Sequence, residues 1–136
     1  MSKRKLYDVV TLYDCMQDPA TVAWLVHIDV PLPATTPAGR YPTPSEIQQV
    51  IEDMLGIRAD YVKSDTVWQV TVRSKKDVFW GNLAVLAYSG DPDEPHHIVF
   101  TDGWDEIIQL VTSHLAKRCG PLVLMHDSGA APQVIL

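Results

Sequence analysis

Cysteine is scarce in this chain, and its two copies lie far apart. Cys15 and Cys119 are the two cysteines among 136 residues, and neither belongs to a Cys-x-x-Cys or Cys-x-His pattern. Zinc and redox centres of the usual spacing are therefore not expected. We expect both to be free thiols that pack as small apolar groups, and a disulfide between them is the alternative that the spacing leaves open.

Long apolar runs are also missing. No stretch approaches the roughly 18 apolar residues that a membrane-spanning helix needs. Met1 to Lys5 carry charge, but the apolar run and cleavage site of a signal peptide do not follow. The sequence thus predicts a cytoplasmic protein with no membrane partner.

Basic residues are outnumbered and unevenly placed. The chain has 11 Lys and Arg against 17 Asp and Glu, which gives a formal net charge of -6. Binding to a phosphate backbone requires clustered Lys and Arg, so nucleic acid is not an expected partner. Between Lys76 and Lys117 there is no Lys or Arg at all.

Motifs of catalysis and cofactor binding are absent from the sequence. There is no phosphate-binding loop, no G-x-G-x-x-G, no H-E-x-x-H and no G-x-S-x-G. His126-Asp127-Ser128 contains residue types of hydrolase triads, but adjacency in sequence is typical of a turn rather than a triad. No cofactor or metal is expected, and the interpretation leans away from an enzyme.

Two helix starts are the clearest features present. Thr43-Pro44-Ser45-Glu46 combines a capping hydroxyl, a proline at the first helical position and a glutamate able to bond back to the cap. It predicts an amphipathic helix over residues 44–55. Asp102 is expected to cap a second helix over residues 103–118. Gly56 and Gly120 are expected to end the two helices.

Apolar alternation and buried runs predict the strands. The expected strands span residues 6–12, 21–30, 67–73, 82–88, 97–100, 122–125 and 132–136. Residues 1–136 are therefore expected to form one α+β domain with a single-layer, mostly antiparallel sheet and both helices on one face. The order strand, helix, strand, strand over residues 22–73 and again over 97–135 suggests a duplicated unit.

Acidic residues fill the interval that lacks Lys and Arg. They are Asp91, Asp93, Glu94, Asp102, Asp105 and Glu106, beside the earlier Asp77. A negative field of this kind attracts a basic protein, and Trp80 could serve as an aromatic anchor. In size and charge, though in no motif, the chain is similar to immunity-type inhibitors, which implies a protein-binding module or adaptor with a basic partner. The alternative is a solvated loop with ordinary helix-start carboxylates.

Two further hypotheses remain open. The first is a small-molecule-binding or catalytic domain, with a pocket between helices and sheet near His96, His97, His126 and Asp127. The second is a structural homodimer that pairs through an edge strand such as residues 68–73, or through the apolar tail at residues 134–136.

The four tryptophans divide into two groups. Trp24, Trp68 and Trp104 fall on apolar faces of their expected elements, so we expect them in the core. Trp80 is expected in a connection between strands, where burial is harder.

Overall fold

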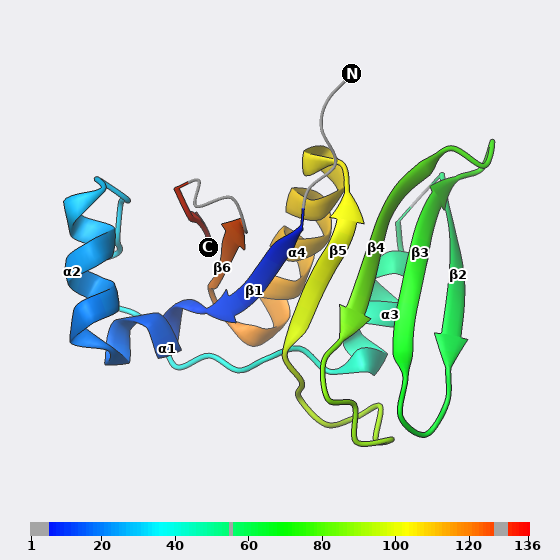
Figure 1. Ribbon diagram of the computed structural model, residues 1–136, viewed down its shortest axis with the longest axis horizontal. Helices are drawn as coiled ribbons and strands as arrows, with labels where there is room; N and C mark the ends of the chain where they lie inside the picture. The colour runs from blue at the N-terminus through cyan, green and yellow to red at the C-terminus, as the bar shows by residue number, and fades with distance from the viewer. Residues whose placement is uncertain (1–5, 55, 127–130) are drawn as a thin grey trace.

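The computed structural model describes residues 6–54, 56–126 and 131–136. In this part of the chain it contains four helices and one seven-stranded sheet (Figure 1). The helices are α1 (Leu12–Gln17), α2 (Pro19–His27), α3 (Pro44–Glu52) and α4 (Asp105–Cys119). The strands are β1 (Tyr7–Thr11), β2 (Ile57–Lys63), β3 (Trp68–Ser74), β4 (Phe79–Val85), β5 (Ile98–Gly103), β6 (Leu122–His126) and β7 (Gln133–Ile135).

Every neighbouring pair of strands is antiparallel, in the order β2-β3-β4-β5-β1-β6-β7. The first strand lies inside the sheet because β5 and β6, which α4 connects, pair with its two edges. The predicted α+β class with a single, mostly antiparallel sheet is confirmed.

Helices α3 and α4 cover one face of this sheet, behind it in Figure 1. The apolar stripe of α3 (Ile47, Val50, Ile51) and that of α4 (Ile108, Val111, Leu115) are buried in one cluster with the inward side chains of β1, β3, β4 and β5. The predicted capping box is present: the Glu46 N–H donates to Thr43 Oγ1 at 3.1 Å, and the Thr43 N–H donates to Glu46 Oε1 at 3.0 Å. Helix α3 therefore begins where its cap predicts, and both helices form where their apolar spacing predicts.

The cap expected for the second helix is different. Asp102 lies within β5, and the residue before α4 is Trp104, whose side chain makes no capping hydrogen bond. The strand continues further than expected because Asn82 and Gly81 of β4 pair with Asp102 and Gly103. At its other end α4 stops as predicted, at Gly120 with φ 98°.

Residues 21–30 are not a strand, which corrects one prediction. Most of them belong to α2, which begins where Asp18 accepts a hydrogen bond from the Ala20 N–H at 3.2 Å and Pro19 occupies the first turn. The alternation of Val22 to Val30 was misleading because this segment is apolar at nearly every position. Trp24, expected in the core, is 43% exposed on α2.

Helices α1 and α2 cover the opposite face of the sheet over β1 and β6. Leu12, Cys15, Leu25, Val30 and Val123 form a second buried cluster there. Successive residues of a strand point to opposite faces, so Leu122 and Leu124 join the first cluster and Val123 joins the second. The two predicted helices, α3 and α4, thus lie on one face of the sheet, and α1 and α2 were not predicted.

The sheet also corrects the expected duplication and the expected edge. The first copy requires a strand at residues 22–30, which are mostly helix. Strand β2 was not expected, and it occupies the edge in place of β3, which pairs with both β2 and β4. Trp80 lies within β4 rather than in a connection.

No helix in the described ranges has the length and apolar character required to traverse a bilayer.

Candidate functional site

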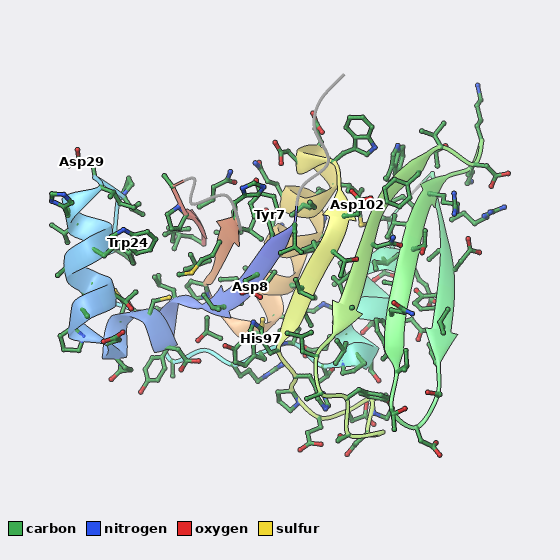
Figure 2. The ribbon with its side chains drawn as sticks, viewed as in Figure 1. Tyr7, Asp8, Trp24, Asp29, His97 and Asp102 are labelled. Atoms are coloured by element: carbon green, nitrogen blue, oxygen red, sulfur yellow. The ribbon has the colours of Figure 1, made fainter. Side chains whose placement is uncertain are left out.

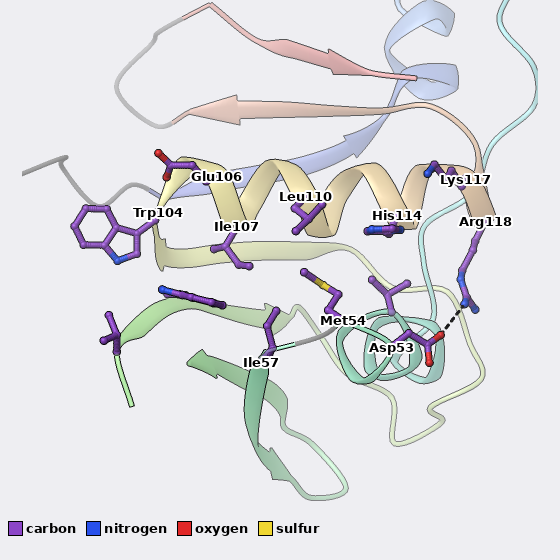
Figure 3. A pocket seen from close by; sticks show the side chains of 13 residues that line it. Asp53, Met54, Ile57, Trp104, Glu106, Ile107, Leu110, His114, Lys117 and Arg118 are labelled. Carbon is purple, nitrogen blue, oxygen red and sulfur yellow. Dashed lines mark ion pairs between the residues drawn. The ribbon is translucent and has the colours of Figure 1, made fainter. Parts of the chain in front are cut away.

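A groove runs along α4 on the helix-covered side of the molecule (Figure 3). Its volume is about 1000 Å³. We call it the α3–α4 groove. Its lining residues are Val50, Asp53, Met54, Ile57, Val78, Trp80, Trp104, Glu106, Ile107, Leu110, His114, Lys117 and Arg118. They come from the end of α3, the starts of β2 and β4, and one side of α4.

The groove lies beside the part of α4 that α3 does not cover. Figure 3 shows α4 from the side and α3 nearly end-on, so α3 crosses α4 near its later turns and leaves the earlier turns open. The stripe of α4 that contacts the sheet is buried, whereas the neighbouring Leu110 is 46% exposed. A large apolar side chain is thereby left facing an open channel.

Two tryptophans form one end of the groove. The Trp104 N–H donates to the Trp80 carbonyl at 2.9 Å, and Trp104 Nε1 donates to the Phe79 carbonyl at 2.9 Å. Both indoles are half-buried and pack against the main core, and the two hydrogen bonds tie Trp104 to β4. A Cβ on Gly103 would lie 3.2 Å from the Cα of Gly81, so glycines permit the close approach of β4 and β5 that places the rings.

The opposite end of the groove is polar. Arg118 reaches across to α3, where it donates to Gln49 Oε1 at 2.8 Å and lies 3.9 Å from the Asp53 carboxylate (Figure 3). Lys117 is exposed, and in the described part of the chain its ammonium has no hydrogen bond or ion pair. His114 lies one turn earlier on the same helix. This end therefore carries a net positive charge.

The predicted acidic residues fall into two separate groups. Asp91, Asp93 and Glu94 lie in the loop between β4 and β5, where Ser45 Oγ donates to Asp93 at 2.9 Å and Ser89 Oγ donates to Glu94 at 2.7 Å. Asp102, Asp105 and Glu106 lie at the far end of β5 and the start of α4. Only Trp80 and Glu106 of the predicted set line the groove.

The structure places the described histidines of the predicted pocket in different surroundings. His96 is buried in the β4–β5 loop, where its ring nitrogens lie 2.6 Å from the Glu94 carbonyl and 3.1 Å from Ser89 Oγ. His97 Nε2 is 3.5 Å from Asp8 Oδ1, an ion-pair distance without hydrogen-bond geometry.

His126 lies on the other face of the sheet from His97. Its ring meets the ring of Tyr7, directly opposite it on β1, with centroids 5.0 Å apart. Tyr7 belongs to the cluster under α4, whereas His97 is near Asp8, which points the other way. The fourth residue, Asp127, lies outside the described residues. Figure 2 shows Tyr7, Asp8 and His97.

The cysteines are free and buried, as expected. Burial raises the pKa of Cys119 to about 11, and burial together with Asp14 raises the pKa of Cys15. Neither is a reactive thiolate near neutral pH. Within residues 6–54, 56–126 and 131–136, no three His, Cys, Asp or Glu side chains gather in a way that could hold a metal ion.

Sequence reasoning did not identify Leu110, His114 and Lys117 as site residues. Leu110 lies outside the apolar stripe of its helix, and this departure was the available signal. No protein-family model, curated protein or solved structure matches this chain.

Proposed function

We propose that this protein binds a small, largely apolar molecule in the α3–α4 groove. The observation that carries the proposal is the groove itself, which combines an apolar lining with a few polar groups gathered at its ends. Its volume of about 1000 Å³ is at the upper limit of the range common for small-molecule sites. A pocket between helices and sheet was the second hypothesis from sequence, although different residues form it.

Binding is favoured over catalysis by the chemistry of the lining. None of the 13 residues that line the groove is Ser, Thr or Cys, so no hydroxyl or thiol nucleophile of these residue types is available there. Both cysteines are buried away from the groove with raised pKa values. We keep the cytoplasm as the proposed location, in agreement with two free thiols.

Substitution of Leu110 tests this function. We expect Leu110→Lys to weaken binding of the neutral fluorescent probe N-phenylnaphthylamine about tenfold, because a charge replaces apolar surface worth roughly 1.5 kcal/mol in the groove. A fluorescence titration measures the affinity. The thermal midpoint should change little because Leu110 is already 46% exposed.

Leu86 provides the matched control. It is 40% exposed in the β4–β5 loop and does not line the groove. Leu86→Lys should leave probe affinity unchanged. Equal affinity of Leu110→Lys and the wild-type chain would refute the groove as the binding site.

A second candidate function is binding of a basic protein, in the manner of an immunity-type or adaptor protein. It is favoured by the acidic loop, because in the described part of the chain Asp91, Asp93 and Glu94 form no ion pair and are ordered by hydrogen bonds. A fixed cluster of unpaired carboxylates attracts cationic surfaces.

Charge reversal tests this second candidate with cytochrome c as a basic probe protein. Changing Asp91, Asp93 and Glu94 to Lys should abolish binding at low salt in calorimetry. The control changes Asp14, Asp29 and Glu52 to Lys, which alters the net charge equally at exposed positions elsewhere. Similar losses from both triple variants would show a response to net charge alone and would exclude the loop as a site.

A further inference from the structure

The polar groups of the α3–α4 groove are sorted by sign along α4. Glu106 lies at the end where the tryptophans are, and Lys117 and Arg118 lie at the opposite end (Figure 3). Glu106 and Lys117 are eleven residues apart in α4. At a rise of 1.5 Å per residue, the groove between them is about 16 Å long.

One of the two cationic side chains at the Lys117 end of the groove has no partner among the described residues. Arg118 is not this side chain, because its guanidinium contacts Gln49 and Asp53 at the neighbouring helix α3. The ammonium of Lys117 makes no such contact with any described residue. The negative end of the α4 dipole lies here, and the two cations outweigh its partial charge.

At the tryptophan end of the groove, both N–H groups of Trp104 are already hydrogen-bonded within the protein. The indole N–H of Trp104 is already bonded to the Phe79 carbonyl, and the backbone N–H of Trp104 is bonded to Trp80. The exposed carboxylate of Glu106 repels a second negative charge. The tryptophan end therefore suits the apolar tail of a ligand. Together the two ends determine which way a ligand with one charged end lies in the groove.

We infer that the ligand is a single-chain amphipathic anion of the fatty-carboxylate class, with its carboxylate at Lys117 and its chain directed toward Trp80 and Trp104. The inference rests on the proposed function and adds the chemistry and the orientation of the ligand. Charge complementarity at Lys117, apolar surface along Leu110 and the length of the groove select this occupant over a compact or cationic molecule.

Three probes with the same chain test the head group. Dodecanoate, dodecanol and dodecyltrimethylammonium, each below its critical micelle concentration, compete with N-phenylnaphthylamine for the wild-type protein. We expect dodecanoate to bind about fivefold more tightly than dodecanol, which corresponds to one exposed ion pair, and the trimethylammonium to bind weakest. The preference for dodecanoate should shrink as salt is raised.

Two charge reversals test the orientation. Lys117→Glu should weaken dodecanoate binding about fivefold or more and leave dodecanol unchanged, since it replaces one ion pair by a repulsion. Lys76→Glu makes the same change in net charge in the β3–β4 turn, close in sequence to the lining residues Val78 and Trp80. It should leave dodecanoate affinity unchanged.

The outcomes separate the inference from the function on which it rests. Equal affinity for the three probes, or a loss caused by Lys76→Glu and not by Lys117→Glu, overturns the inference and leaves the groove as an apolar site. If neither N-phenylnaphthylamine nor any of the three dodecyl compounds binds, the proposed function is overturned as well.

Discussion

Arg40 and Glu46 form a short salt bridge with two hydrogen bonds. The guanidinium donates to both carboxylate oxygens, at 2.6 Å and 2.9 Å, while the same carboxylate accepts the Thr43 N–H. The bond to Arg40 is the main reason that the pKa of Glu46 falls to about 2. One residue thus caps α3 and ties it to the extended segment before it.

This lowered pKa predicts how stability depends on pH. Because the folded state holds the proton of Glu46 less tightly than the unfolded chain does, the stabilisation is complete above the unfolded pKa near 4.5 and is lost as pH falls toward 2. We expect a loss of about 1 to 2 kcal/mol over this range, discounted because Arg40 is 46% exposed.

Urea unfolding of the wild-type protein and Glu46→Gln between pH 2 and pH 7 measures this effect. The variant should be less stable at pH 7 and should approach the wild type near pH 2, since its amide does not titrate. If the unfolding free energies of the two proteins differ by a constant amount from pH 2 to pH 7, the lowered pKa of Glu46 is contradicted.

At the scale of elements, local signals predicted the helices of the main core and failed elsewhere for identifiable reasons. The capping box of α3 and the glycine after α4 act within a few residues, so they are legible in sequence. The start of α2 carries an equally local signal, Asp18-Pro19, but the uniformly apolar residues after it imitate a buried strand. Strand β2 was missed although its inward residues Ile57, Ala59 and Tyr61 alternate with polar ones.

The candidate site could be predicted only in part, because it depends on packing between elements. Trp80 and Glu106 were singled out from sequence, and both line the groove. Leu110 and Lys117 acquire their places only when α3 packs beside the later turns of α4. His97 and His126 are separated because they lie on opposite faces of the sheet, and His96 is held in the β4–β5 loop.

At the scale of the molecule, two cores lie on opposite faces of one sheet. The larger core lies under α3 and α4, and the smaller lies under α1 and α2. The outer face of β2 and β3 remains polar, with Arg58 and Arg73 both within 3.5 Å of the Asp60 carboxylate. The α3–α4 groove is therefore an apolar opening on the same side of the sheet as the main core.

The most direct test of the central claim is a nuclear magnetic resonance titration that follows the four tryptophan indole N–H signals as dodecanoate is added. The account predicts shifts for Trp80 and Trp104, which line the groove. It also predicts no shift for Trp68, which is 2% exposed in the core, or for Trp24 on α2. Shifts confined to Trp24, or no shift for any indole, would contradict the assignment of the groove as the binding site.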